Sequence, residues 1–323
     1  MKKIFLKVLL LLFLLPLFSQ LDSIVQGDVL IVQSYHSGYK WTDEVQSGLI
    51  TTLRNNNPKL RIFTEYLDSK RFSSPEELKF TADTFIRRYN SSRFDVIVAV
   101  DNYALTFLLK IRPLLFPETP LVFCGINGFQ ESSLGGQKGI TGVNEKAGIR
   151  RNLQLIQKLH PNITNLLIIN DDTITGQELN REIESALNII PPRIKVRYEH
   201  TISMENLKEV ISGLPEQSVI LYTLFFKDSN GVFYEFDQSI INIVEAAKCP
   251  VYGCWDFSLD YGIVGGYLAS GIYQGNKAAE KVLQILNGAD VNTLGYDMDS
   301  ANQFIFDYNV LKKWGIKSGK LPS

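Results

Sequence analysis

The chain has 323 residues with a formal net charge of −1; 45% of the residues are hydrophobic and 21% are charged. These values are typical of a globular protein, and they exclude a disordered tail, a collagen-like fibre and a coiled coil. Because the net charge is close to zero, the sequence lacks the basic footprint of a nucleic-acid-binding protein, and no nucleic-acid partner is expected. At roughly 150 residues per domain, the length predicts about two domains.

The first twenty residues differ from the rest of the chain. Three lysines lie within residues 1–7, and residues 8–18 are apolar except for Pro16. A basic start followed by a short apolar run is typical of a secretory signal, and a membrane-spanning helix needs about 20 apolar residues. Ser19 and Gln20 offer no A-x-A cleavage pattern. We therefore predict an exported, periplasmic or extracytoplasmic protein whose residues 1–20 are a signal peptide or, alternatively, an uncleaved membrane anchor.

Three cysteines are too few for a disulfide scaffold. Cys124 lies in an apolar strand pattern, and Cys249 and Cys254 are five residues apart. The simplest interpretation is that all three are buried small hydrophobic residues. A disulfide between Cys249 and Cys254, and a metal or redox role, are the alternatives.

Short apolar runs alternate with amphipathic stretches along the rest of the chain. In the first half, strands are predicted at residues 28–33, 61–66, 95–100 and 120–124, and helices at 42–53, from 74 onward and at 105–115. In the second half, strands are predicted at residues 165–170, 194–199, 218–222 and 251–253, and helices at 149–159, 176–188, 204–211, 233–248 and 276–286. Continuous apolar strands separated by helices indicate parallel sheets covered on both faces.

The irregular count and spacing of these units disfavour a (β/α)8 barrel. The predicted fold class is therefore α/β, with two doubly wound parallel-sheet lobes joined by a hinge. In such sheets, ligands bind beyond the carboxyl ends of the strands. Small hydroxyls, amides, carboxylates and aromatic rings recur at these positions, and this mixture suits a small polar ligand held by hydrogen bonds and ring stacking.

Eleven residues at these strand ends are the candidate ligand-binding residues. They are Ser34, Tyr35, Trp41, Asp101, Asn102 and Asn127 from the first lobe, and Thr175, Thr223, Phe225, Trp255 and Asp256 from the second. The aromatic rings are expected to stack on a planar part of the ligand. Asp101 or Asp256 is expected to pair with an amine of the ligand.

Most of these candidates have a purely structural alternative. Ser34 and Asp101 could instead cap helices, as Ser and Asp commonly do. Tyr35 and Trp41 could be packing aromatics. Residues 170–172, Asn-Asp-Asp, could suggest a cation site, but no spaced acidic ligands follow as in a calcium loop, so a cap-and-turn role is favoured.

The evidence for an enzyme is weak. Neither an H-E-x-x-H motif nor a G-x-S-x-G elbow occurs. His36 follows the first predicted strand, two residues after Ser34, but no third group completes a catalytic set. Gly262, Gly265 and Gly266 match neither G-x-G-x-x-G nor a Walker loop and indicate a backbone turn between the lobes. We predict no catalytic residue, no metal site and no cofactor, with an exported hydrolase as the remaining enzymatic alternative.

Four segments, at residues 34–42, 122–127, 139–143 and 309–316, resemble the ABC-transporter substrate-binding protein family that includes tryptophan- and tyrosine-binding members. The resemblance spans the chain from about residue 28 onward. It implies a type I periplasmic binding fold with three crossovers and a ligand clamped between the lobes. Residues 27–145 with about 266–290 would then form lobe 1, and residues 146–265 with about 300–323 would form lobe 2.

The resemblance implies an exported protein that binds a small-molecule ligand, such as an amino acid or another small polar or planar solute, and docks on the membrane permease of an ABC importer. Residues 34–42 look most like members that serve as extracytoplasmic sensing domains of histidine kinases and diguanylate cyclases. The alternative function is therefore the ligand-sensing domain of a membrane receptor.

Overall fold

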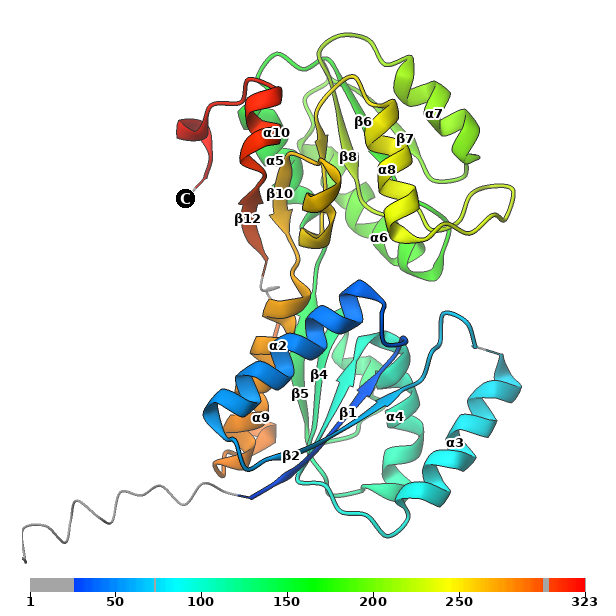
Figure 1. The fold of residues 1–323 in the computed structure, drawn as a ribbon, viewed down its shortest axis with the longest axis vertical. Helices are drawn as coiled ribbons and strands as arrows, with labels where there is room; N and C mark the ends of the chain where they lie inside the picture. Colours follow the sequence, from blue (N-terminus) through cyan, green and yellow to red (C-terminus); the bar gives the residue numbers. More distant parts are fainter. Residues whose placement is uncertain (1–25, 73, 299–301, 323) are drawn as a thin grey trace, which may run out of the picture.

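The computed structural model describes residues 26–72, 74–298 and 302–322, which form two lobes stacked along the long axis of the molecule (Figure 1). The predicted signal peptide or anchor, residues 1–20, lies outside the described residues. In the described part of the chain, no helix combines the length and the apolar character needed to cross a membrane.

Lobe 1 is built on a parallel sheet with the strand order β11-β5-β4-β3-β1-β2. Its strands are β1 (Asp28–Gln33), β2 (Arg61–Tyr66), β3 (Val96–Val100), β4 (Leu121–Asn127), β5 (Ile140–Glu145) and β11 (Tyr296–Asp297). Its helices are α2 (Lys40–Asn56), α3 (Pro75–Tyr89), α4 (Asp101–Leu115) and α9 (Gly271–Leu286), with short 3-10 turns at Glu131–Leu134 and Val291–Thr293.

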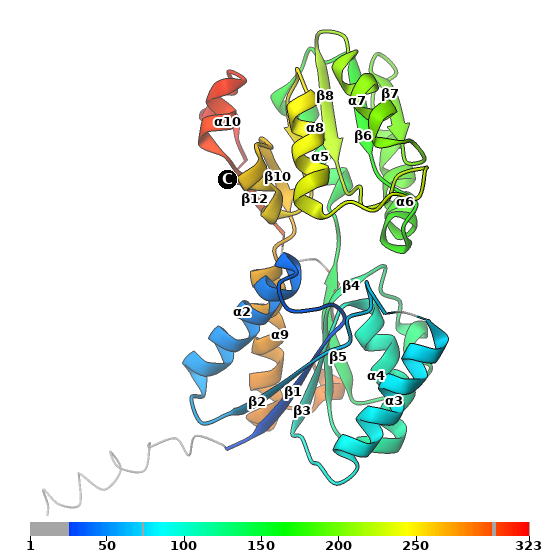
Figure 2. The ribbon, with the colours of Figure 1, turned by 45° about the vertical axis from the view of Figure 1, so that its right-hand side comes forward.

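Helices cover both faces of this sheet, which explains why central strands such as β3 are apolar and fully buried, whereas the edge strand β2 mixes polar and apolar residues and is partly exposed. Figure 2 shows α2 and α9 on one face and α3 and α4 on the other. In β3, Val96 and Val98 pack into the core on the α2 and α9 side, whereas Ile97 and Ala99 pack into the core on the other side. The predicted helix start at Ser74 is confirmed, because its hydroxyl accepts a hydrogen bond from the Glu77 backbone N–H.

Lobe 2 contains a parallel sheet with the order β7-β6-β8-β9 and an antiparallel pair, β10-β12. Its strands are β6 (Asn165–Ile169), β7 (Lys195–Glu199), β8 (Ser218–Tyr222), β9 (Val251–Tyr252), β10 (Gly265–Leu268) and β12 (Gln303–Phe306). Its helices are α5 (Ile149–Leu159), α6 (Ile174–Ala186), α7 (Met204–Ser212), α8 (Phe236–Ala246) and α10 (Tyr308–Lys313), with 3-10 turns η2 (Leu187–Ile189), η3 (Asp256–Tyr261) and η5 (Ser318–Lys320). The α/β class with parallel sheets is thereby confirmed.

The chain passes between the lobes more than once. It leaves lobe 1 after β5 ends at Glu145 and returns after β10 ends at Leu268; β11 then lies in lobe 1 and β12 in lobe 2. The return to lobe 1 therefore begins a few residues later than the predicted 266, and lobe 1 extends to Asp297 rather than about 290.

The elements that the sequence analysis misses or shortens share features that weaken their sequence patterns. The strands β5, β10, β11 and β12 are short or contain glycine, and α9 begins at Gly271 rather than at 276. A Cβ atom on Gly275 would lie 2.2 Å from the Val45 carbonyl oxygen of α2. Glycine is therefore needed for the close contact of α9 with α2, although it weakens the helical pattern in the sequence.

Gly265 and Gly266 do not form the turn that the sequence suggests. They open β10, and a Cβ atom on Gly265 would lie 2.2 Å from the Ile305 carbonyl oxygen of β12. Gly265 also has a φ of 123°, which L side chains rarely adopt. These glycines therefore serve the close approach of two strands.

The cysteines are free thiols in the described structure. Cys124, Cys249 and Cys254 are all buried, so the disulfide alternative between Cys249 and Cys254 does not form. Burial raises the pKa of Cys249 to about 11 and the pKa of Cys124 and Cys254 well above the usual value. Such thiols are protonated and unreactive at neutral pH.

Candidate ligand-binding cleft between the lobes

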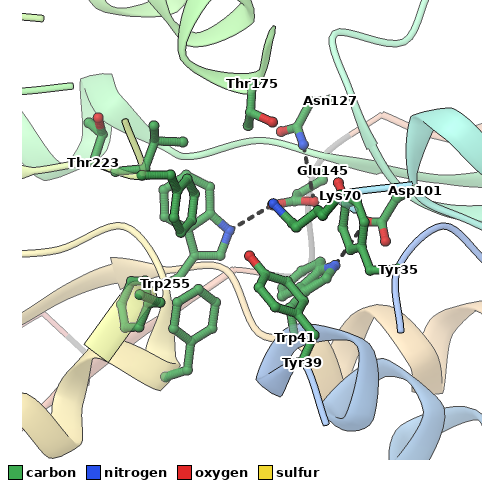
Figure 3. Close-up of a pocket in the computed structure, with 14 residues that line it drawn as sticks. Tyr35, Tyr39, Trp41, Lys70, Asp101, Asn127, Glu145, Thr175, Thr223 and Trp255 are labelled. Atoms are coloured by element: carbon green, nitrogen blue, oxygen red, sulfur yellow. Dashed lines mark hydrogen bonds between the residues drawn. The ribbon is translucent and has the colours of Figure 1, made fainter. Parts of the chain in front are cut away.

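A pocket of about 480 Å³, including its open mouth, lies where the two lobes face each other. In each sheet the strand order reverses once, between β1 and β3 in lobe 1 and between β6 and β8 in lobe 2. Such switch points are where open α/β sheets bind ligands. The residues that line the pocket are Tyr35, Tyr39, Trp41, Lys70, Asp101, Asn127, Glu145, Thr175, Thr223, Leu224, Phe226, Phe236, Trp255 and Phe257 (Figure 3).

Asp101 is a buried carboxyl at the lobe 1 switch point. Its side chain follows β3, only 4% of the residue is exposed, and its Oδ1 accepts a hydrogen bond of 2.8 Å from Trp41 Nε1. Its Oδ2 is buried and has no hydrogen-bond partner among the described residues. Burial raises the pKa of Asp101 to about 7, an effect opposed by the Trp41 hydrogen bond and by the charge of Lys70.

The backbone around Asp101 is arranged specifically for this carboxyl. Asp101 has a φ of 68°, in the left-handed region that non-glycine residues seldom occupy. A Cβ atom on Gly125, at the neighbouring strand β4, would lie 2.7 Å from Asp101 Oδ1. Gly125 therefore leaves the space in which the carboxyl sits, and its own φ of 69° also favours glycine.

Glu145 is a second buried carboxyl, at the end of β5. It is 3% exposed, and it accepts hydrogen bonds from Trp255 Nε1 at 2.7 Å and from Asn127 Nδ2 at 3.3 Å. Burial, and secondarily the charge of Asp101, raise its pKa to about 8. Trp255 belongs to lobe 2, so this hydrogen bond joins the two lobes directly beside the crossover (Figure 3).

Lys70 places its ammonium group among three aromatic rings. Its Nζ lies 4.5 Å from the ring centroid of Tyr35, 4.8 Å from that of Tyr39 and 4.7 Å from that of Phe226. These distances are within the range of cation–π attraction. Tyr35 and Tyr39 belong to lobe 1 and Phe226 to lobe 2, so this cage is shared between the lobes. Burial lowers the pKa of Lys70, an effect opposed by Asp101, Asp171 and Glu235.

Asp171 fixes the lobe 2 side of this cage. Its Oδ2 accepts hydrogen bonds from the backbone N–H groups of Phe226, at 2.6 Å, and Lys227, at 3.3 Å. Its Oδ1 accepts from the backbone and the hydroxyl of Thr173, which caps α6. The role of Asp171 is thus to join two loops. Within the described ranges, no group of three or more His, Cys, Asp or Glu side chains is placed to hold a metal ion.

The structure brings seven of the eleven predicted site residues to the pocket. They are Tyr35, Trp41, Asp101, Asn127, Thr175, Thr223 and Trp255. Their position is a structural finding, and their contact with a ligand stays a prediction.

The other four predicted residues do not line the pocket. The Ser34 hydroxyl is buried between the Val100 carbonyl, to which it donates, and the Ala104 N–H, from which it accepts, so it holds the start of α4. The Asn102 side chain forms two hydrogen bonds of 3.0 Å with the Asn127 backbone: it donates to the carbonyl and accepts from the N–H. Phe225 is fully buried in the core of lobe 2.

Asp256 is the fourth of these residues, and it begins η3 next to the crossover to lobe 1. Burial raises the pKa of Asp256. Burial, and secondarily the charge of Asp256, raise the pKa of Glu44 in α2 to about 7. His36 also lies outside the pocket, 3.3 Å from Asp68.

Seven lining residues were not among the predicted contacts: Tyr39, Lys70, Glu145, Leu224, Phe226, Phe236 and Phe257. Tyr39 and Phe226 lie in the segments after β1 and β8 and could have been chosen by the same argument. Lys70 follows β2, which was predicted with its correct bounds, so the strand-end argument could have reached this residue as well. Glu145 ends β5, a strand that was not predicted. Phe236 and Phe257 come from a helix start and a 3-10 turn, for which strand ends give no signal.

The fold of this chain is similar to the folds of several solved solute-binding proteins. An ABC domain from Streptococcus pneumonia in complex with L-Trp superposes with a TM-score of 0.65 at 12% identity, covering 92% of this chain and 97% of that one. A ligand-free, open substrate-binding protein with adhesive properties from Clostridium difficile gives a TM-score of 0.67 at 14% identity, covering 90% and 96%. An arabinose-binding protein from Geobacillus stearothermophilus gives 0.60 at 14% identity, covering 90% and 99%.

At these identities the structures show the fold alone. The family model for ABC transporter substrate binding proteins matches residues 42–320, and the chain belongs to this family. No curated protein sequence matches the chain. This match confirms the resemblance seen in the sequence. Members of the family bind small molecules outside the cytoplasm and work with ABC transporter permeases.

Proposed function

We propose that this chain is an exported solute-binding protein that clamps a small ligand between its two lobes and delivers it to the permease of an ABC importer. The observation that carries the proposal is the pocket at both switch points, with seven lining residues from each lobe. A ligand in this position touches both lobes at once. It therefore stabilises the closed arrangement by its higher affinity for that state.

Contacts that cross the cleft support a closing motion. Trp255 Nε1 donates to Glu145, and the Lys70 ammonium faces the ring of Phe226. At the mouth, Lys40 in α2 pairs with Asp260 in η3 at 2.9 Å, but both side chains are well exposed, so this pair adds little stability. The specific contribution to closure is thus expected from the buried contacts and from the ligand.

We also propose that the ligand is bound without being converted. The hydroxyls that line the pocket include Thr175 and Thr223, and none of the described histidines lines it. Nucleophilic catalysis by a hydroxyl requires an adjacent base, and no such pair lines the pocket. Residues 1–20 would direct the chain out of the cytoplasm, either as a cleaved signal or as an anchor.

The first experiment is a thermal-shift screen of residues 21–323 against amines, amino acids, purines, sugars and organic acids. A ligand at 100 times its Kd adds about 2.7 kcal/mol of stability, which such a screen detects. Small-angle X-ray scattering with the strongest hit should then show a smaller radius of gyration. Absence of any hit from folded, ligand-free protein would contradict the proposed function, and conversion of the hit, followed by mass spectrometry, would contradict binding without turnover.

A further inference from the structure

The composition of the pocket points to the charge of its ligand. Half of its fourteen lining residues are aromatic, two are buried carboxyls, Asp101 and Glu145, and one, Lys70, is cationic. Aromatic faces and carboxylates are the groups that recognise organic cations. Resting on the proposed function, we propose that the ligand is a small organic cation whose protonated or quaternary amine takes the place of the Lys70 ammonium between Tyr35, Tyr39 and Phe226.

The cage already holds an ammonium group, and this is the most direct support. Three ring centroids lie between 4.5 and 4.8 Å from Lys70 Nζ. The Nζ makes no hydrogen bond to any described residue, so the three rings are its established close partners. Lys70 therefore acts as a tethered cation that occupies the cage when no ligand is bound.

Lys70 can leave the cage without breaking the fold. It lies in the loop between β2 and α3, and it makes no salt bridge among the described residues. The residue as a whole is exposed, although its ammonium group is enclosed by the three rings. A ligand cation would replace it and push it towards solvent. Because Phe226 comes from lobe 2, and Asp171 fixes the backbone of Phe226, the cage is complete only when the lobes are close together.

The second support is the vacant oxygen of Asp101. Asp101 lines the pocket, and its Oδ2 is buried without a partner among the described residues, although Oδ1 accepts a hydrogen bond from Trp41. An unpartnered buried oxygen costs stability, and a protonated amine of the ligand would supply the missing donor. Asp101 and Lys70 line the same pocket, so a cation that replaces the Lys70 ammonium lies in the same cavity as this carboxyl.

A zwitterionic ligand would use the pocket differently. Its carboxylate would need Lys70 as a partner, because Lys70 is the only cationic side chain among the lining residues. Removing Lys70 would then abolish the binding of a zwitterion. For a cation, removing Lys70 frees the cage and strengthens binding, so the two classes predict opposite effects of one substitution.

The experiment measures binding by isothermal titration calorimetry at pH 8 with three probes that share one ring: phenethylamine, phenylalanine and 3-phenylpropionate. Choline, with its neutral isostere 3,3-dimethyl-1-butanol, tests a quaternary cation. The variant is Lys70→Ala, and the matched control is Lys277→Ala, an exposed lysine on α9 outside the pocket. If Lys70 occupies the cage most of the time, Lys70→Ala should lower the Kd of phenethylamine or choline about tenfold, because apparent affinity scales with the vacant fraction.

The expected result is tighter binding of a cation by Lys70→Ala, unchanged binding by Lys277→Ala and no binding of 3-phenylpropionate or of the neutral isostere. Binding of phenylalanine that Lys70→Ala abolishes would overturn the proposal, as would failure of both cations to bind either form. Thermal unfolding of each variant checks the fold. If cations fail while another solute class gives a thermal shift, the proposed function stands and only the inference about charge falls.

Discussion

The two walls of the cleft differ in the charge of the side chains that line them. The lobe 1 wall holds every charged side chain that lines the pocket, namely Lys70, Asp101 and Glu145. The lobe 2 wall contributes only neutral residues: Thr175, Thr223, Leu224, Phe226, Phe236, Trp255 and Phe257. Lobe 1 thus supplies the electrostatic part of recognition, and lobe 2 supplies a largely aromatic cover.

This asymmetry suggests an order of events. A charged ligand is attracted to lobe 1 first, while the cleft is open and wet. Closure of lobe 2 then removes water, which strengthens the electrostatic contacts on lobe 1 and adds ring contacts. Trp255 reaches across the cleft, because its Nε1 donates a hydrogen bond to Glu145 on the opposite wall.

The largest expected effect comes from the lobe 1 wall. Asp101→Asn removes the buried negative charge but keeps the shape of the side chain, so it should weaken phenethylamine or choline binding at least about 30-fold, as expected for loss of one member of a buried charge pair. Asp172→Asn, an exposed carboxylate beside His200 outside the pocket, is the control and should change the Kd little. Equal Kd values for both variants, measured by calorimetry, would remove Asp101 from recognition.

A smaller effect is expected from the lobe 2 wall. Phe226→Ala removes one face of the cage and should weaken cation binding about tenfold, in line with one to two kcal/mol for a desolvated cation–π contact. The control is Phe233→Ala, an exposed ring in lobe 2 that lies outside the pocket. The dissociation rate, measured by stopped flow, should account for the change, because lobe 2 acts by closing. A pure loss of association rate would contradict the proposed order of events.

The pH dependence should follow the lobe 1 carboxyls. The pKa of Asp101 is about 7 and that of Glu145 about 8, both above their ordinary values. The folded protein therefore holds more protons than the unfolded chain between about pH 4 and pH 8, so the stability of the free protein should fall as pH rises through these pKa values. Cation affinity should rise about fivefold from pH 6 to pH 8.5, because ionised carboxyls bind cations better.

Neighbouring groups do not reverse this direction. The charges of Asp101 and Glu178 raise the pKa of Glu145 further, and the charge of Lys70 opposes the effect of burial on Asp101 without cancelling it. Thermal melts and calorimetry at both pH values provide the check. In Asp101→Asn the pH dependence of both stability and affinity should become flatter. If the two profiles are unchanged, the pH dependence arises from groups other than Asp101.

The sequence predicts the fold better than it predicts the cleft. Strands such as β1 and β8 follow the apolar pattern and match their predicted bounds, because a buried parallel sheet demands continuous β-branched and aliphatic residues. The strand-end rule also selects half of the lining residues. It misses Glu145, since β5 contains Gly142 and polar residues at its end and does not look like a strand.

The rule also fails where a residue after a strand serves the scaffold. Phe225 and Phe226 are adjacent after β8, but the first is fully buried in the core of lobe 2 and only the second faces the cleft. Side-chain direction in such a loop depends on the hydrogen bonds from Phe226 and Lys227 to Asp171, which is 55 residues from Phe226 in the sequence. Neither composition nor periodicity reports a contact of that kind.

The smallest expected effect belongs to Asp256, the carboxyl that the sequence ranks equal to Asp101. It lies outside the pocket, its Oδ1 has no partner among the described residues, and its charge helps to raise the pKa of Glu44 to about 7. Asp256→Ala should change the Kd of phenethylamine by less than about twofold, since surface and scaffold changes away from a site have small effects. It should also lower the pKa of Glu44, because one repelling charge is gone. A tenfold loss of affinity with an intact thermal transition would extend the charged wall of the cleft into lobe 2, and the contrast between the walls would then be wrong.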